Sequence, residues 1–323
     1  GWPVERIAPA GGGANSRIFK VEAAQGSAAM KRYPAPTAQD PRDRLAVETR
    51  ALRFMRAGGL TQTPPVLAAA PDRHVAFLSW IDGAPVASPT AEHLGQAETF
   101  LKAVMALSDG PSADAIDPAP RCCLSPAEII RQVDQQADAL RPALAAASAP
   151  QAFFVGDYAA ARSAFADRAK ADARRAGLVF DAPIPRERMR ILPADFGFHN
   201  ALETEDGVCH FLDFEYFGWD DSVKIVSDVI LHPGHGLSPP QARGLAERLA
   251  SWIAMRDDAF MARYRMSLRL FGLRWALIVL KKAAEMQNNS KKNQDSHFAH
   301  AKLDEARAIL DFCAVYTPGR IND

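Results

Sequence analysis

The chain has no excess of charge of either sign. Its 323 residues include 38 lysines and arginines and 38 aspartates and glutamates, which gives a formal net charge of +0 at pH 7. Without an overall field the chain is not drawn to DNA, RNA or anionic membranes, so we expect no nucleic-acid partner. Cysteine is scarce too: the 4 cysteines show no C-x-x-C spacing. This excludes a disulfide scaffold and favours free thiols and a cytoplasmic location.

Long apolar runs are also missing. The longest, from Phe271 to Leu280, is about ten residues and contains Arg274, whereas a membrane span needs roughly twenty. The run predicts a buried helix, and we expect no membrane insertion. No basic segment followed by an apolar one occurs at the N-terminus, so no signal peptide is expected.

The length is about twice that of an ordinary domain, which predicts two lobes. Strand-like alternation recurs early in the chain, at 17–23, 27–33 and 74–81. Beyond about residue 90 helical periodicity dominates, except for strand-like runs at 190–192 and 208–214. We therefore expect an α+β fold with a β-rich N-terminal lobe over residues 1–82 and a mainly α-helical C-terminal lobe over residues 83–323.

Polar residues interrupt the second strand-like region. The stretch LPADFGFHN over residues 192–200 spaces Asp195 and Asn200 as D-x-x-x-x-N, and Asp213 follows the next apolar run. Phosphoryl transfer from a Mg-nucleotide uses these oxygen groups: one carboxylate to orient a hydroxyl, and an amide oxygen and a second carboxylate to hold divalent cations. Residues 195–197 also spell the D-F-G metal motif of protein kinases. No D-x-x-x-x-N precedes them, so we predict Asp213 as the metal ligand.

Two N-terminal features agree with this chemistry. The glycine cluster at residues 11–13, followed by Asn15 and Ser16, can bring backbone N–H groups close to phosphates. Lys31 ends a predicted strand, and Glu48 lies on the following helix in a position to pair with it. Taken singly, these features also fit an ordinary turn and solvated surface charges. Their order along the chain, together with Asp195, Asn200 and Asp213, is that of kinases.

The chain resembles the superfamily of aminoglycoside phosphotransferases and choline/ethanolamine kinases, small-molecule kinases with a bilobal protein-kinase-like fold. Three stretches carry the resemblance: GGANSRIFKV over residues 12–21, DFGFHN over 195–200, and LDFEY over 212–216 with GWDD over 218–221 and Asp228 beyond it. The chain departs from the family at Pro193, where the catalytic loop usually has a histidine that supports the loop.

The resemblance implies ATP and Mg²⁺ as cofactors and assigns roles to single residues. Asp195 orients or deprotonates the acceptor hydroxyl, and Asn200 and Asp213 are Mg²⁺ ligands. Lys31 contacts the α- and β-phosphates, with Glu48 as its partner. The phosphate loop includes Gly12, Gly13, Asn15 and Ser16, and the hinge at 79–82 would meet the adenine through Ser79, Trp80 and Ile81.

The resemblance specifies the phosphate donor, ATP, but leaves several classes of phosphate acceptor. Candidate substrate residues are Glu215, which could also support the metal, and Trp219, Asp220, Asp228 and Trp275. The carboxylates favour a small-molecule hydroxyl on a sugar or amino sugar. A choline/ethanolamine-type kinase and a catalytically inactive nucleotide-binding module of the same fold are the alternatives. Trp275 also belongs to an apolar stripe that fits a helix core, and a homodimer is the candidate assembly.

Overall fold

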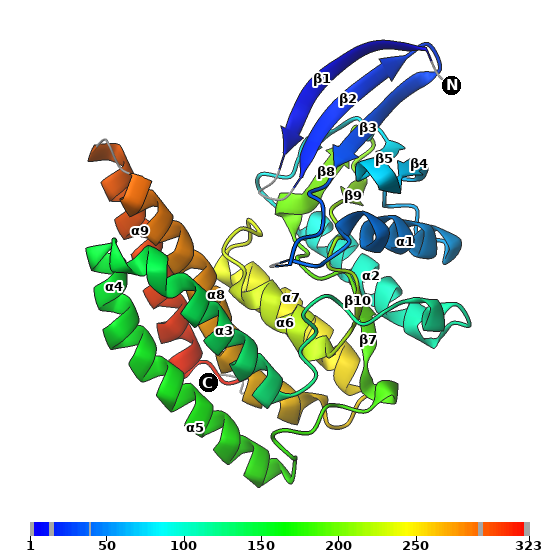
Figure 1. Cartoon of the computed structure of the whole chain (residues 1–323). Helices are drawn as coiled ribbons and strands as arrows, with labels where there is room; N and C mark the ends of the chain where they lie inside the picture. The colour runs from blue at the N-terminus through cyan, green and yellow to red at the C-terminus, as the bar shows by residue number, and fades with distance from the viewer. Residues whose placement is uncertain (1–2, 13–15, 39, 290–292, 320–323) are drawn as a thin grey trace. The chain divides into compact units, whose positions relative to one another are not determined.

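The computed structural model describes residues 3–12, 16–38, 40–289 and 293–319 (Figure 1). The chain divides into two compact units that do not follow its sequence order. Unit 1 is drawn from Gly1–Cys122, Arg190–Asp220 and Gly234–Ser238, and unit 2 from Cys123–Met189, Asp221–Pro233 and Pro239–Asp323. The lobe boundary expected near residue 82 stays a prediction.

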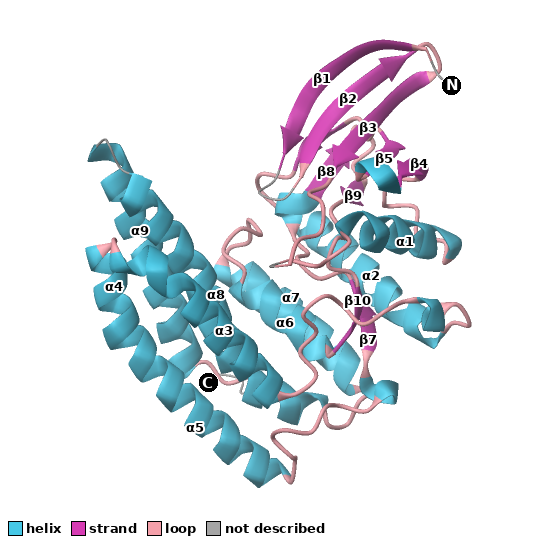
Figure 2. Cartoon of the chain, viewed as in Figure 1, coloured by secondary structure: helices cyan, strands magenta, loops and turns pink. Residues whose placement is uncertain are grey.

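Unit 1 contains a five-stranded antiparallel sheet in the order β1-β2-β3-β5-β4 (Figures 1 and 2). Its strands are β1 (Val4–Gly12), β2 (Arg17–Ala23), β3 (Gly26–Arg32), β4 (Val66–Ala70) and β5 (Val75–Ser79). The predicted hairpin of β2 and β3 is confirmed, with Ala23 opposite Gly26 at its turn. Strand β1 was not expected, and its pairing with β2 shifts register twice, the second time between Pro9 and Gly11.

Helix α1 (Arg44–Ala57) follows the sheet's first three strands. Asp43 caps its N-terminus by accepting a hydrogen bond from the Ala46 backbone N–H, and Gly58 ends it. Arg44 and Glu48 are one turn apart and both buried. The helix therefore buries two charged side chains on one face, and both require partners.

The rest of unit 1 surrounds the polar loop identified in the sequence. It comprises α2 (Ala91–Ala106), the sheet β6-β8-β9 and the pair β10-β7. These strands are β6 (Gly83–Pro85), β7 (Arg190–Leu192), β8 (Ala201–Thr204), β9 (Cys209–Phe211) and β10 (Gly218–Asp220). The ring of Phe100 on α2 contacts those of Phe196, Phe211 and Phe214, so an aromatic core underlies both loops that carry the candidate residues.

Unit 2 is helical in its described part. Its helices are α3 (Pro126–Ala145), α4 (Ser148–Phe153), α5 (Ala159–Ala176), α6 (Ser222–Leu231), α7 (Pro239–Ala254), α8 (Phe260–Asn289) and α9 (Asn293–Val315). Helix α8 packs against α3, α5, α6 and α9, and contains the apolar run predicted to be a buried helix. A side chain at Gly272 would collide with Cys313 on α9, so glycine permits this close approach.

The predicted fold class is confirmed: an antiparallel sheet occupies the N-terminal part of the chain and helices dominate the C-terminal part. Among the described residues, every helix is too short or too polar to span a membrane. The cysteines at 122, 123, 209 and 313 are free thiols.

Candidate active site

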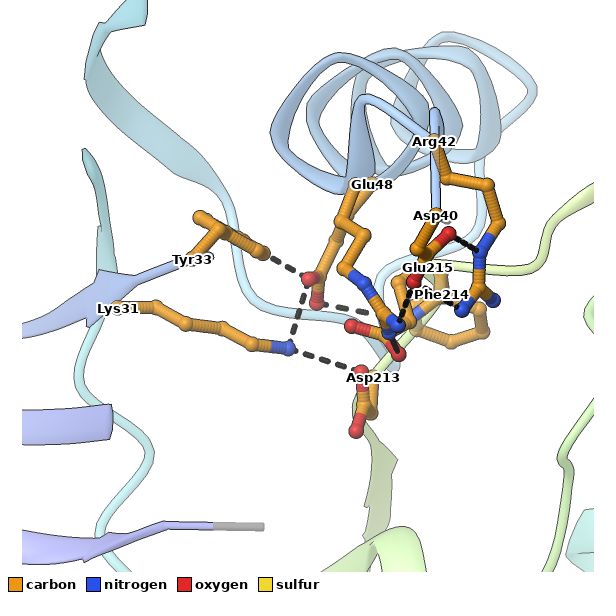
Figure 3. A network of polar contacts seen from close by, with 9 residues as sticks. Lys31, Tyr33, Asp40, Arg42, Glu48, Asp213, Phe214 and Glu215 are labelled. Atoms are coloured by element: carbon orange, nitrogen blue, oxygen red, sulfur yellow. Dashed lines mark hydrogen bonds and ion pairs between the residues drawn. The ribbon is translucent and has the colours of Figure 1, made fainter. Parts of the chain in front are cut away.

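Lys31 and Glu48 form a buried ion pair in unit 1. Lys31 Nζ, on β3, lies 2.7 Å from Glu48 Oε2, on α1 (Figure 3), and the two residues are 4% and 1% exposed. Burial alone lowers the pKa of Lys31, but the carboxylates of Glu48 and Asp213 outweigh this effect and hold that pKa above its usual value. The pairing predicted from sequence is confirmed, and Lys31 is a fixed positive charge at neutral pH.

Asp213 is the second partner of this lysine. Its Oδ1 lies 2.9 Å from Lys31 Nζ, and its side chain is 32% exposed (Figure 3). Its backbone is left-handed, with φ 66°, which is uncommon for a residue with a side chain. The following N–H, of Phe214, donates to Glu48 Oε1 at 3.4 Å. Glu48 thus contacts both the lysine and the segment that carries Asp213.

The loop that carries Asp195 is held by its own hydrogen bonds. Both Ala194 and Asp195 have left-handed backbones, with φ of 45° and 43°. Asn200 Nδ2 donates to the Asp195 backbone oxygen at 3.0 Å. Because the amide nitrogen is used inside the loop, the amide oxygen is the atom available to a cation. The Asp195 side chain is 40% exposed, and its Oδ1 lies 3.6 Å from His199 Nε2.

Aromatic packing fixes the same loop from beneath. Phe196 and Phe198 are buried, and Phe196 stacks on Phe100 with ring centroids 5.8 Å apart. Gly197 lies between them, at a position where a side chain would press against the His199 ring. Pro193, where the resemblance expects a histidine, is buried in the loop. Two phenylalanine anchors therefore hold a loop that lacks that histidine.

The predicted nucleotide loop is described only at its edges. Gly13 and Asn15 lie outside the described residues, whereas Gly12 ends β1 and Ser16 precedes β2. The predicted hinge begins at Ser79, the last residue of β5, and continues through Trp80 and Ile81 toward β6.

Backbone hydrogen bonds fix the start of this hinge. The Ser79 N–H donates to Pro65 O at 2.9 Å, and the Trp80 N–H donates to Ser27 O at 3.4 Å. Lys20 Nζ lies 4.9 Å from the Trp80 ring centroid. The role of residues 79–81 toward a nucleotide stays a prediction.

Glu215 is engaged within unit 1. Its carboxylate pairs with the Arg44 guanidinium, and the two residues are 2% and 5% exposed. Burial raises the pKa of Glu215, and the nearby Asp213 carboxylate adds to this rise while Arg44 opposes it. Arg44 also contacts Asp40, at 2.8 Å. The pair joins helix α1 to the segment that follows Asp213.

The other acceptor candidates lie in both units. In unit 1, Trp219 and Asp220 are buried on β10, and Trp219 Nε1 donates to Ala113 O at 3.1 Å. In unit 2, Trp275 Nε1 donates to Asp228 Oδ1 at 2.8 Å, and the other Asp228 oxygen pairs with Lys224. The substrate roles of these residues stay predictions.

Tyr33 and Arg44 belong to the polar network but were not singled out from the sequence. Tyr33 lies two residues beyond Lys31 on a strand-like path, a spacing that places two side chains on the same face. Arg44 lies four residues before Glu48 on a helix, which is the corresponding helical spacing. These two periodicities are the signals that could have identified them.

Neither the protein-family models nor the curated protein sequences match this chain. Several solved structures are similar to it. Spectinomycin phosphotransferase APH(9)-Ia, in complex with ADP and spectinomycin, has a TM-score of 0.55 and 12% identity, covering 96% of this chain and 92% of that one. Choline kinase from Cryptosporidium parvum Iowa II has a TM-score of 0.55 and 10% identity, covering 95% and 89%.

A third similar structure, Plasmodium vivax ethanolamine kinase, has a TM-score of 0.56 and 10% identity, covering 94% of this chain and 81% of its own. All three are small-molecule kinases by name. The chain has the fold of the aminoglycoside phosphotransferases and the choline and ethanolamine kinases, as the sequence motifs predicted.

Proposed function

We propose that this chain is an ATP-dependent kinase that transfers the γ-phosphoryl group of ATP to a hydroxyl group of a small molecule. One observation carries the proposal: Lys31, buried and charged, bridges Glu48 and Asp213, which come from different parts of the chain. Burying a lysine and two carboxylates costs desolvation energy that their pairing at best repays, so such a cluster indicates a functional use rather than a stabilising one. The kinase-like fold and the nearby Asp195 loop indicate that this use is to bind nucleotide phosphates.

The residues of unit 1 fit a divalent cation. Mg²⁺ prefers oxygen ligands, and Asp213 supplies a partly exposed carboxylate. Asn200 supplies an amide oxygen, because its nitrogen is already bonded to the Asp195 backbone. The backbone oxygen of Asn200 accepts a hydrogen bond from the Leu212 N–H at 2.8 Å, which holds the two proposed ligand residues close together. Mg²⁺ held by these two residues would supply charge neutralisation on the phosphates.

The proposed transfer assigns a role to each remaining side chain. Lys31 holds the α- and β-phosphates, and Glu48 fixes the direction of its ammonium group. Asp195 accepts the proton of the acceptor hydroxyl while that oxygen bonds to the γ-phosphorus and the bond to the ADP oxygen breaks. Most of the rate enhancement then comes from positioning and electrostatic stabilisation.

For the acceptor we propose a neutral, sugar-like hydroxyl compound. The acidic segment after Asp213 raised the alternative of an amino sugar, whose amines need free carboxylates. In unit 2, however, Asp221 is paired with Arg263 at 2.8 Å, and Asp228 is paired with Lys224. Carboxylates that already have internal counter-charges favour a neutral acceptor over a polycation.

A coupled ADP-release assay tests this function. The purified chain is incubated with MgATP and a panel of neutral sugars and polyols, amino sugars, aminoglycosides, choline and ethanolamine. We expect acceptor-dependent ADP release with a neutral member of the panel and none with EDTA. Release only with choline or ethanolamine would move the acceptor to the choline-kinase class.

A thermal-shift measurement separates an active kinase from an inactive module of the same fold. We expect MgATP to raise the unfolding temperature more than ATP with EDTA does, because the cation and the phosphates share the site. Binding without turnover of any acceptor would favour a nucleotide-binding module. Absence of a shift with either form would contradict nucleotide binding altogether.

A further inference from the structure

We propose that Tyr33 is a positioning residue for Lys31 and acts through the carboxylate of Glu48. This inference rests on the proposed kinase function, in which Lys31 binds phosphates. Tyr33 has no role in the interpretation of the sequence motifs. It lies just beyond the end of β3 and is 3% exposed.

The geometry gives Tyr33 a direct contact with Glu48. Tyr33 Oη donates a hydrogen bond to Glu48 Oε2 at 2.8 Å, the same oxygen that accepts from Lys31 Nζ at 2.7 Å (Figure 3). The Tyr33 backbone N–H donates to His74 O at 2.8 Å, which fixes the base of the side chain. The ring also lies beneath the ammonium group, with Lys31 Nζ 5.2 Å from its centroid.

Three donors therefore converge on one buried carboxylate. Oε2 accepts from Lys31 and Tyr33, and Oε1 accepts from the Phe214 N–H. Tyr33 is the uncharged side-chain donor of this set, and among the residues that the structure describes its hydroxyl donates to Glu48 alone. Burial, followed by the charge of Glu48, raises the pKa of Tyr33, so its hydroxyl stays protonated and able to donate across the physiological range.

The Tyr33 hydroxyl matters most when Asp213, the second partner of Lys31, holds a cation. Lys31 shares its charge between Glu48 and Asp213. A cation held by Asp213 competes with Lys31 for that carboxylate, which leaves Glu48 as the main counter-charge of the ammonium group. The Tyr33 hydrogen bond then keeps Glu48 from following Lys31 toward the phosphates, so the ammonium group stays where β3 places it.

A double-mutant cycle distinguishes this role from simple packing. Tyr33→Phe removes only the hydroxyl, and Glu48→Ala removes its acceptor. We expect Tyr33→Phe to lower kcat/KM for MgATP about three- to tenfold, the effect of losing one hydrogen bond of ordinary net strength, with KM for the acceptor unchanged. In the Glu48→Ala background the same substitution should change kcat/KM by less than about twofold.

Tyr264→Phe is the matched control. Tyr264 is buried on α8, and its hydroxyl has no hydrogen-bond partner among the described residues, so its removal should leave kcat/KM unchanged. An equal loss from Tyr33→Phe in both backgrounds, or no loss in either, would overturn the proposal. So would a loss confined to KM for the acceptor.

Failure of the kinase function gives a different result. If the wild-type chain shows no MgATP-dependent thermal shift, the proposed function fails. The same cycle is then run on the urea midpoint of unfolding. Non-additive midpoints would still support the coupling of Tyr33 to Glu48, and additive ones would overturn it.

Discussion

The backbone oxygen of Asn200 accepts a hydrogen bond from the Leu212 N–H at 2.8 Å. Asp213 is the next residue, so the two proposed metal ligands are joined by a backbone contact across neighbouring segments. The Asn200 side chain in turn holds the Asp195 backbone. The residues proposed for acceptor activation and for cation binding therefore lie on two segments joined by hydrogen bonds, and substitutions at them should have separable effects.

Asp195→Asn should separate binding from turnover. The amide keeps the size of the side chain but cannot take the proton of the acceptor hydroxyl. We expect ADP release to fall by about 10²- to 10⁴-fold, the usual contribution of a general base. The MgATP-dependent thermal shift should be retained. Near wild-type turnover in this variant would contradict the role of Asp195.

Asp213→Asn should abolish the cation dependence of nucleotide binding. The substitution removes a proposed ligand of Mg²⁺ and one of the two counter-charges of Lys31. We expect the thermal shift with MgATP to shrink to that with ATP and EDTA, and turnover to fall on the order of 10²-fold or more. Asp206→Asn, at an exposed carboxylate in the turn between β8 and β9, is the control. A full MgATP shift in Asp213→Asn would exclude this aspartate as a ligand.

Breaking the buried pair of Arg44 and Glu215 should destabilise the fold. Arg44→Met leaves the Glu215 carboxylate buried without its counter-charge, and we expect the free energy of unfolding to fall by about 3–5 kcal/mol. Adding Glu215→Leu should recover most of this loss. Arg50→Met is the control on the same helix, because the Arg50–Asp117 pair is exposed and worth less than about 1 kcal/mol. Urea unfolding measures all three, and equal losses in Arg44→Met and Arg50→Met would contradict the prediction.

The fold should lose stability in alkaline solution through Lys31 and Tyr33. Both pKa values are raised in the folded state above their ordinary values of 10.5 and 10.0. Folding therefore retains protons that the unfolded chain releases, so their contribution is complete below about pH 10 and decreases above it. We expect the unfolding free energy to fall with a slope of up to about 1.4 kcal/mol per pH unit for each group.

Tyr33→Phe tests the share of this slope due to the phenol. Urea unfolding between about pH 9 and 11.5 should show a shallower decline for the variant than for the wild-type chain. Tyr264→Phe does not serve as a control for this measurement, because burial also raises the pKa of Tyr264. Parallel curves for Tyr33→Phe and wild type would show that Tyr33 does not titrate differently in the two states.

The sequence predicted those features that depend on local pattern and chain order. The β2–β3 hairpin, helix α1 and the short strand β7 follow from periodicity and turn residues. The pairing of Lys31 with Glu48 followed from the order of motifs. Strand β1 did not, because Pro9 and a glycine-rich end interrupt its alternation, and its pairing with β2 is correspondingly irregular.

The sequence pattern does not show which charged residues form ion pairs with one another. Asp221 belongs to the GWDD stretch of the sequence motifs, yet Arg263, 42 residues later, pairs with it. Glu215 likewise meets Arg44, 171 residues earlier in the chain. Such contacts are selected by tertiary packing, since burying either charge alone would be costly. The sequence therefore identified the carboxylates, and only the structure showed which of them are already neutralised.

The contacts of helix α1 also limit the population of any conformer in which the helix is displaced from β3. Moving it away from β3 would strip Glu215 of Arg44 and Lys31 of Glu48. Such a movement breaks two buried ion pairs together, which makes a helix-displaced conformer a minor one. In this chain the lysine and its carboxylate are assembled before any ligand arrives, and binding energy need not be spent to bring them together.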